Sequence, residues 1–388
     1  MQNFIFENPT KIIFGRGQIK RIGQETVRFG KKVLLVYGQS SIKKNGIYDQ
    51  VISSLAESRL VIVEFPGVRS NPVLSHALKG IEIARREGVE VILAVGGGSV
   101  IDTAKTIAAG VGADHDVWDF FTFKKTIQSA LPVLTVLTIS ASASEMNAAA
   151  VITREDGCQK YSIRSPHIQP KVSILDPSVL FTLDRAYSAF SAVDAITHML
   201  EGYFNNTEPN LSPLQDGMVE GLMKTIMGAT EKILQHSDDY DARANMMWAA
   251  TLAFNGLTTA GMGQIALPVH MIEHSLSALY DVAHGAGLSI VLPGWMKSQL
   301  PGKAGRFAKL GREVFGVGAE NDEAAALACI ERLKEWFSLV GSPVSLGEAK
   351  IPVQDIEKIA ENAAALAQVW GLKSYTKEVI KDILKLCV

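Results

Sequence analysis

Short apolar runs alternate with amphipathic segments through the first half of the chain. The runs are rich in β-branched residues and carry few charges, a pattern typical of buried strands. The strand candidates are residues 11–15, 33–38, 60–65, 89–95, 131–138 and 172–176. The segments between them repeat apolar side chains at helical spacing, and Pro72 suits a first helical turn; these helix candidates are residues 46–58, 72–88 and 100–110. The alternation predicts a mostly parallel sheet with helices on both faces.

The pattern changes after about residue 183, where strand-like runs stop and helical periodicity takes over. The helix candidates are residues 188–204, 212–235, 238–259, 305–315, 324–337 and 353–368. We therefore expect an α/β domain over residues 1–183 and an all-helical domain over residues 184–388. With neither an internal repeat nor a low-complexity linker, the two domains are expected to pack closely.

Composition narrows the class of protein. The 388 residues are 47% hydrophobic and 20% charged, which is typical of a soluble globular protein of roughly two domains. A net charge of −2 gives no basic field that would attract nucleic acid or an anionic membrane. Three widely spaced cysteines and an N-terminus without basic and apolar blocks predict a cytoplasmic protein without disulfides or a signal peptide.

Residues 244–272 carry no Asp, Glu, Lys or Arg and are long enough to cross a bilayer. Three glycines, polar amides and Pro268 interrupt the stretch, however, and such residues break a single helix. We interpret it as two buried helices joined by a glycine turn. An uncharged stretch of this kind predicts that the neighbouring site lies in the protein core and is shielded from water.

Three of the eight histidines lie at the end of this stretch or shortly after it: His270, His274 and His284. Each ring could be an ordinary buried or surface histidine, or the three could converge on a metal ion. Asp194 and His198 favour the metal, because a pair four residues apart leaves the same face of a helix. On one straight helix His270 and His284 would lie about 21 Å apart, so the chain must turn near residues 279–281 if both bind.

This donor set has a defined chemistry. One carboxylate with several imidazoles suits a borderline divalent ion such as Fe(II) or Zn(II), and no cysteine lies near enough in sequence to make a structural thiolate site. A single carboxylate leaves the site cationic. Such a site is suited to polarising a carbonyl or alkoxide oxygen.

A second motif, GGGS at residues 96–99, lies between a predicted strand and a predicted helix. Peptide N–H groups at such a turn bind phosphate, helped by the helix dipole, and glycines let a pyrophosphate approach the backbone. The motif is not G-x-G-x-x-G, and many tight strand–helix turns are equally glycine-rich. Ser99 and Asp102 also fit a capping box, so Asp102 is either a cap or part of the phosphate loop.

The turn after the strand at residues 33–38 bears on the choice of nucleotide. Residues 37–46 (YGQSSIKKNG) contain no acid, and an acid there would bind a ribose diol and repel a 2′-phosphate. Gln39, Ser40 and Ser41, with Lys43 and Lys44 nearby, leave room for that phosphate. The turn therefore favours NADP, with NAD as the alternative, although both lysines could simply face solvent.

Together these segments resemble the iron-containing (group III) alcohol dehydrogenase family. The similarity runs along nearly the whole chain, and its most specific parts are AVDAITHMLEGY (192–203) and VHMIEHSLSALYDVAHGAGLSIVLP (269–293). Less specific matches are FENPTKIIFGRG, SNP, AVGGGSVIDTAK, TISASASEMNAAAVIT and ILDPSVLFTL. Within the family, GQSSIKKNG and H-x-x-x-H-S-L-S-A resemble the branch of butanol dehydrogenases and NADPH-dependent aldehyde reductases.

The resemblance implies a dehydroquinate-synthase-like fold, in which an N-terminal dinucleotide-binding domain and a helical metal-binding domain form the active site. It implies four metal ligands, Asp194, His198, His270 and His284, and a histidine of the substrate cavity, His274, as the catalytic candidate. It also implies cofactor contacts at Gly38, Gln39, Ser40, Asn71, Gly97, Gly98, Ser99, Asp102, Thr138, Ser142, Asn147 and Lys160. Much of the family has T-x-G-T-G-S-E where this chain reads TISASASE, with Ala141 and Ala143 in place of two glycines.

The expected function is hydride transfer between NADP(H) and a small aldehyde or primary alcohol, with one divalent metal polarising the substrate oxygen and His274 relaying a proton. The alternative is a metal-dependent lyase or cyclase on the same fold, which the uncharged residues 244–272 disfavour because a phosphorylated substrate needs Lys and Arg. A nucleotide-binding protein without catalysis is the third candidate. The resemblance implies a homodimer, in which an exposed N-terminal edge strand could pair.

Overall fold

The computed structural model describes residues 1–205 and 212–388, which form two compact units. The first, which we call the α/β unit, contains residues 7–183 and 236–251. The second, the helical unit, contains residues 1–6, 184–235 and 252–388. The predicted boundary at residues 183 and 184 stays a prediction.

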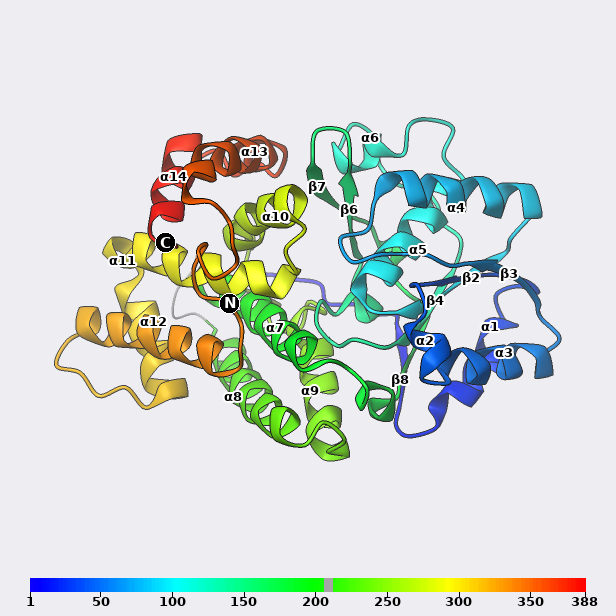
Figure 1. Ribbon diagram of the computed structural model, residues 1–388, viewed down its shortest axis with the longest axis horizontal. Coiled ribbons are helices and arrows are strands. Elements are labelled where there is room, and N and C mark those ends of the chain that lie inside the picture. Colours follow the sequence, from blue (N-terminus) through cyan, green and yellow to red (C-terminus); the bar gives the residue numbers. More distant parts are fainter. Residues whose placement is uncertain (206–211) are drawn as a thin grey trace. The chain divides into compact units, whose positions relative to one another are not determined.

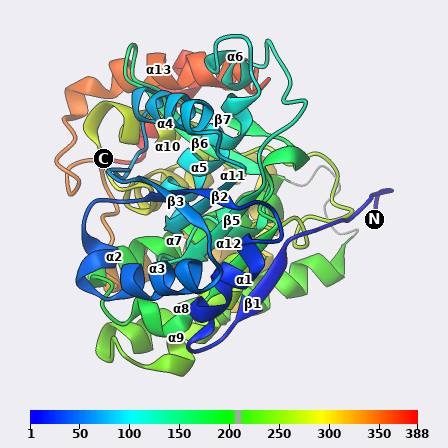
Figure 2. The same ribbon diagram turned by 90° about the vertical axis from the view of Figure 1, so that its right-hand side faces the viewer.

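A six-stranded sheet forms the centre of the α/β unit, in the order β1-β8-β5-β4-β2-β3. Figure 2 labels β1, β5, β2 and β3 of this sheet. All of its neighbouring strands are parallel, which confirms the predicted parallel sheet. Its strands are β1 (Lys11–Phe14), β2 (Lys32–Tyr37), β3 (Val61–Phe65), β4 (Val91–Gly96), β5 (Val133–Leu137) and β8 (Val172–Leu175). The central strands are buried on both faces, which explains their continuous apolar sequence.

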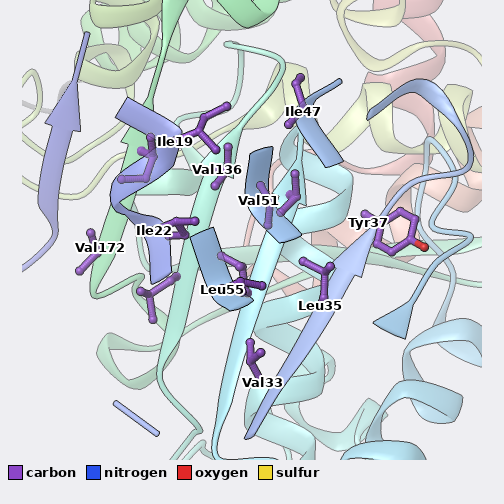
Figure 3. Close-up of a cluster of buried hydrophobic side chains, with 14 of the residues drawn as sticks. Ile19, Ile22, Val33, Leu35, Tyr37, Ile47, Val51, Leu55, Val136 and Val172 are labelled. Atoms are coloured by element: carbon purple, nitrogen blue, oxygen red, sulfur yellow. The ribbon is translucent and has the colours of Figure 1, made fainter. Parts of the chain in front are cut away.

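Helices cover both faces of this sheet. On one face, apolar side chains of β2, β4, β5 and β8 pack against α1 (Ile22–Thr26) and α3 (Ile47–Glu57), as Figure 3 shows. Alternate strand residues point to the opposite face, where α5 (Gly98–Val111) packs on β4 and α4 (Leu74–Glu87) packs on α5. The remaining helices of this unit are α2 (Ser41–Lys44), α6 (Trp118–Phe121) and α9 (Tyr240–Ala253), the last two residues of which belong to the helical unit. Short 3₁₀ turns lie at Gln18–Arg21, Ser144–Met146, Pro166–Ile168 and Pro177–Leu180.

Three details of the α/β unit differ from the sequence prediction. Helix α4 begins at Leu74 rather than Pro72, because the Pro72 carbonyl accepts a hydrogen bond from the Thr153 amide and holds the chain extended. Helix α5 begins inside the glycine motif, at Gly98. An antiparallel hairpin, β6 (Ala149–Arg154) and β7 (Gln159–Arg164), was missed although Asp156–Gly157 is a hairpin signal.

The helical unit contains α7 (Arg185–Asn205), α8 (Pro213–Gln235), α10 (Pro268–Tyr280), α11 (His284–Phe315), α12 (Asp322–Leu339), α13 (Ile356–Val369) and α14 (Lys377–Lys385), with a 3₁₀ turn at Val353–Asp355 (Figure 1). Within the described part of the chain, every element after β8 is a helix or helical turn, as the sequence predicted. The predicted helix at 238–259 is too long, since α9 ends at Ala253. Gly256, Gly261 and Gly263, all with positive φ, belong to the segment between α9 and α10.

Among the residues that the structure describes, no helix combines the length and the apolar character that a membrane span requires. The uncharged residues 244–272 form parts of α9 and α10 with a non-helical connection between them. The prediction of two helices joined by a glycine turn is confirmed. Their apolar faces lie within the protein, since Met247, Ala250, Val269 and Ile272 are all buried.

Candidate active site

Helix α7 carries the first two predicted metal ligands. Asp194 and His198 lie one turn apart on its buried face. The His198 Nδ1 lies 3.0 Å from the main-chain oxygen of Asp194 and 3.0 Å from its Oδ1. The ring of Phe254 lies over His198, with ring centroids 4.2 Å apart. His198 is thus oriented by its own helix turn and covered by an aromatic side chain.

A sharp break between α10 and α11 brings His270 and His284 to the same place. Helix α10 ends at Tyr280, and Asp281 caps it in the left-handed conformation with φ 53°. Helix α11 then begins at His284, so the turn predicted near residues 279–281 is confirmed. A Cβ on Gly285 would lie 2.1 Å from the Phe190 carbonyl oxygen, so glycine permits α11 to approach α7 closely at this point.

Three of the predicted ligands converge on one point. The Asp194 Oδ1 lies 3.6 Å from the Nε2 of His270 and 3.8 Å from the Nε2 of His284. Donor atoms of these three residues all lie within 4.8 Å of one another. Asp194 Oδ1 and His270 Nε2 are buried, and neither has a hydrogen-bond partner in the described parts of the chain. The ring of His198 lies on His270, with centroids 4.1 Å apart, but its nitrogens are not part of this three-residue group.

Two buried glutamates that the sequence analysis did not identify lie behind these histidines. Glu201 on α7 contacts His270 Nδ1 through Oε2, and Glu273 on α10 contacts His284 Nδ1 through Oε2. Both side chains are fully buried. A carboxylate on Nδ1 fixes the ring orientation and leaves Nε2 as the ligand atom, an arrangement common at metal sites. The sequence feature that could have identified them is an acid within an otherwise apolar helical segment, close to a candidate metal ligand.

The carboxylates make this place favourable for positive charge. Burial alone raises the pKa of Asp194, but His198, His270 and His284 outweigh it and hold that pKa well below its usual value. Burial lowers the pKa of His270, yet Glu201 and Asp194 raise it to about 9. Burial and the neighbouring His270 lower the pKa of His198. Ionised oxygen and imidazole nitrogen facing one another provide the donors that a divalent cation requires.

His274, the catalytic candidate, lies one turn after His270 on α10 and is buried. Its ring centroid is 5.6 Å from that of His284 and 5.4 Å from that of Trp370, which follows α13. Donor atoms of Glu273, His274 and His284 form a second group within 4.8 Å. His274 therefore lies beside the convergent ligands, under an aromatic side chain that the sequence analysis did not single out.

The glycine motif of the α/β unit forms the turn from β4 to α5. Gly96 ends the strand, Gly97 is the N-cap, and Gly98 is the first residue of the helix. A Cβ on Gly97 would lie 2.9 Å from Ile139 Cβ, and one on Gly98 would lie 2.6 Å from Ser142 Oγ. The turn is therefore packed against the segment after β5, and its peptide groups start a helix of 14 residues, which suits an anionic group.

The structure does not support the capping-box interpretation of Asp102. Gly97 occupies the N-cap, and Ser99 lies inside the helix. Asp102 instead accepts hydrogen bonds from Ser144 Oγ at 2.6 Å and from the Val151 amide at 3.0 Å. The prediction failed because the helix begins at Gly98, two residues earlier than the sequence suggested.

The other predicted cofactor contacts also belong to the α/β unit. Thr138 and Ser142 are partly exposed, and the Thr138 amide donates to the Gly96 carbonyl. Asn147 is buried and donates through Nδ2 to the Ser142 carbonyl. Lys160 Nζ lies 3.1 Å from Asn71 Oδ1 and donates to it. The structure thus groups Thr138, Ser142 and Asn147 by the glycine turn, and Asn71 with Lys160.

At the turn after β2, Gly38 is partly buried while Gln39 and Ser40 are exposed. An acid reaches this region from the neighbouring strand, since Glu64 of β3 accepts hydrogen bonds from Tyr37 (2.6 Å) and Tyr48 (2.8 Å). The Tyr37 hydroxyl, followed by Tyr48 and Lys43, outweighs burial and keeps the pKa of Glu64 below its usual value.

Lys43 is turned toward this acid. Its Nζ lies 4.0 Å from Glu64 Oε2 and 4.5 Å from the ring centroid of Tyr48. Residues 37–46 contain no acid, but the pairing of β2 with β3 brings Glu64 beside the turn, which the sequence of the turn alone does not show. The charge near this turn is therefore less positive than the two lysines suggested.

Two family models together match nearly the whole chain. The model described as iron-containing alcohol dehydrogenase matches residues 9–177. The model described as the C-terminal part of the Fe-containing alcohol dehydrogenase family matches residues 188–388. The first contains the glycine turn, and the second contains the convergent histidines.

Individual relatives are similar over most or nearly all of their length. The probable NADH-dependent butanol dehydrogenase 1 of Bacillus subtilis (strain 168) is 40% identical over 388 residues, which is 99% of each chain. The NADPH-dependent aldehyde reductase YqhD of Escherichia coli (strain K12) is 36% identical over 351 residues, 90% of this chain and 89% of that one. The crystal structure of NADH-dependent butanol dehydrogenase A from Thermotoga maritima is 47% identical, with a TM-score of 0.96, and covers 100% of this chain and 99% of that one.

Proposed function

This chain belongs to the iron-containing alcohol dehydrogenase family, and from that membership we propose that it transfers a hydride between a nicotinamide dinucleotide and a small aldehyde or primary alcohol. The observation that carries the proposal is the convergence of Asp194, His270 and His284 on one buried point. Relatives named as butanol dehydrogenases and as an aldehyde reductase support the substrate class.

The residues present fit a divalent metal. Asp194, His270 and His284 would hold it, with His198 as the fourth predicted ligand. Asp194 Oδ1 and His270 Nε2 are buried and make no hydrogen bond to the residues that the structure describes, so a cation would give them a partner. One carboxylate with imidazoles suits Fe(II) and Zn(II), and the family is named for iron. When bound, the ion supplies Lewis-acid polarisation of the substrate oxygen, and the nicotinamide supplies or accepts the hydride.

The chain's own residues complete the reaction by holding positions and moving a proton. His274, beside His284, is placed to give a proton to the product oxygen in reduction and to accept it in oxidation. Phe254 and Trp370 lie over His198 and His274, so aromatic carbon borders the site and excludes water. An apolar border of this kind favours a short aliphatic substrate over a phosphorylated one.

For the cofactor, the α/β unit combines features that favour each dinucleotide. Ser40, Ser41 and Lys44 leave room for a 2′-phosphate, as NADP requires. Glu64 lies near Lys43 and neutralises part of its charge. We propose that the chain accepts both NADPH and NADH. We also propose that Glu64→Gln raises the ratio of kcat/KM for NADPH over NADH by about two- to fivefold; the factor is small because a partly exposed ion pair contributes little free energy. An unchanged ratio would exclude Glu64 from cofactor choice.

The first test follows the absorbance of the reduced nicotinamide with butanal as substrate. We expect turnover with protein loaded with Fe(II) or Zn(II), and loss of turnover after chelation. We expect His274→Ala to retain the metal and to lose about 10²-fold in kcat, with a flattened pH profile. If no short aldehyde consumes NADPH or NADH in metal-loaded protein, the dehydrogenase function is wrong.

A further inference from the structure

A lysine is completely buried in the helix that begins at the glycine turn. Lys105 lies two turns into α5, among small and apolar residues, and has no solvent exposure. Neither the sequence analysis nor the proposed reaction assigns it a role. A buried ammonium group is expensive unless it is fully hydrogen-bonded, so its partners indicate what it does.

Lys105 Nζ donates to a single stretch of chain. It donates to Ser144 Oγ at 2.9 Å and to the Ala149 carbonyl at 2.7 Å. It also donates to the carbonyl of Asn147 at 2.9 Å and to its Oδ1 at 3.2 Å. All of these acceptors follow β5, in the segment that carries several predicted cofactor contacts.

The contacts continue from Lys105 to the glycine turn itself. Asn147, held through Oδ1 by Lys105, donates through Nδ2 to the Ser142 carbonyl at 3.0 Å. Ser142 Oγ lies where a Cβ on Gly98 would be only 2.6 Å away. One buried ammonium group therefore sets the position of Ser142 over the first residue of the helix.

Asp102 holds the other side of the same segment, one turn earlier on α5. It accepts from Ser144 Oγ at 2.6 Å and from the Val151 amide at 3.0 Å. Ser144 is thus bonded to both charged groups of the helix. Glu145, the next residue, is buried and accepts from Thr251 at 2.6 Å, so the segment is fixed on both of its sides.

We propose that Lys105 is a positioning residue for the cofactor: it holds residues 138–147 against the start of α5, so that these residues and the glycine turn form one rigid nucleotide-binding surface. The proposal rests on the proposed function for its ligand, a nicotinamide dinucleotide. Lys105 acts through Asn147 and Ser142 and has no exposed surface that could touch the cofactor.

The test replaces Lys105 with Met, which keeps the length and removes the charge. The matched control is Arg243→Met, which removes another buried cation of the α/β unit, one whose Nε donates to the Ser237 carbonyl. We expect Lys105→Met to weaken binding of NADPH and NADH, measured by fluorescence titration, by about tenfold or more, with kcat at saturating cofactor nearly unchanged. The control should lose thermal stability without this change in affinity.

Two further measurements keep the proposal testable. If Lys105→Met does not fold, Ser144→Ala removes one shared partner and should weaken cofactor binding in the same direction by a smaller factor. Amide hydrogen exchange at residues 138–147 should be faster in the Lys105 or Ser144 variant than in wild type, and unchanged in the control. Wild-type affinity and wild-type exchange in both variants would overturn the proposal. If the wild type binds neither dinucleotide, the proposed function fails, while the exchange measurement still decides the role of Lys105.

Discussion

Each of the two compact units contains a cluster of buried carboxylates, and the two clusters have different partners. In the helical unit, Asp194, Glu201 and Glu273 face imidazole rings, and both glutamates contact the Nδ1 of a predicted ligand. Imidazole rings both bind protons and bind metal ions. The acids of this cluster therefore lie beside groups that also bind metal ions, which fits the cation that we propose at its centre.

In the α/β unit, one pair of buried carboxylates has a lysine beside it. Lys105 lies next to Asp102 and Glu145, and Ser144 bonds to both Lys105 and Asp102. Burial raises the pKa of Asp102 and of Glu145, although Lys105 opposes the shift. The charges of this cluster are therefore matched by its own side chains, and we call Asp102, Lys105, Ser144 and Glu145 together the clamp. The comparison separates an acid cluster with imidazole partners, which fits the proposed metal site, from an acid cluster with an ammonium partner, which fits the proposed positioning role of Lys105.

The sharpest way to break this comparison is to remove the metal or its carboxylate. We expect Asp194→Asn, or chelation of the wild type, to reduce kcat/KM by about 10³-fold, because a Lewis acid contributes several kcal/mol. Elemental analysis and steady-state kinetics measure both effects. The affinity for NADH should stay as in wild type, since the clamp around Lys105 contains no metal ligand. Full activity in Asp194→Asn would remove the metal from the mechanism.

The glutamates behind the histidines should have the next largest effect. Glu201→Gln and Glu273→Gln remove the charge that orients His270 and His284, and we expect metal affinity to fall by about 10–100-fold. Glu220→Gln is the matched control, because Glu220 is a buried acid of the same unit that accepts from the Tyr203 hydroxyl. Equal metal loss in all three variants would mean that the effect is one of stability.

A smaller effect should come from the two alanines that replace glycines of the family motif. Ala143 adopts the left-handed conformation with φ 52°, whereas Ala141 is not among the residues with positive φ. We expect Ala143→Gly to be more stable than Ala141→Gly by about 1–2 kcal/mol, because only the first relieves backbone strain. Denaturant unfolding of both variants measures the difference. If the two variants have the same free energy of unfolding, the positive φ at Ala143 does not cost stability.

The smallest expected effect concerns Asp216, an acid of the helical unit whose partners are cations. Burial raises the pKa of Asp216, but hydrogen bonds from Arg306 and Lys309 outweigh it, so the net pKa lies below its usual value of 3.8. The stabilisation is therefore complete above that pH and is lost as the pH falls through the lower folded pKa. We expect the thermal midpoint to fall by a few degrees as the pH is lowered below 3.8, and Asp216→Asn to flatten this part of the curve. A wild-type curve in the variant would contradict the assignment.

Much of this arrangement follows from local sequence. The alternation of apolar runs and helical segments predicted the parallel sheet, because strands buried on both faces must be continuously apolar. The break near Tyr280 was predicted from distance alone, since one straight helix cannot bring His270 and His284 together.

What was missed depends on contacts between distant segments. Glu64 lies beside the turn after β2 only because β3 pairs with β2, and Glu201 reaches His270 only because α7 and α10 pack together. In the sequence, Lys105 looks like an ordinary helix residue. Its burial becomes evident only in the fold, where β6 and the segment before it supply its hydrogen-bond acceptors. The start of α4 was shifted because the Pro72 carbonyl bonds to the hairpin, a tertiary contact that overrides the local helix signal.

The break at Asp281 has a consequence for folding as well as for chemistry. Because it lets three helices contribute one donor each, an ion bound there would cross-link segments that lie far apart along the chain. A cross-link of this kind restricts the unfolded ensemble and makes unfolding depend on metal concentration. Calorimetry at graded concentrations of Fe(II) or Zn(II) would then detect occupancy as a rising transition temperature, with no substrate present.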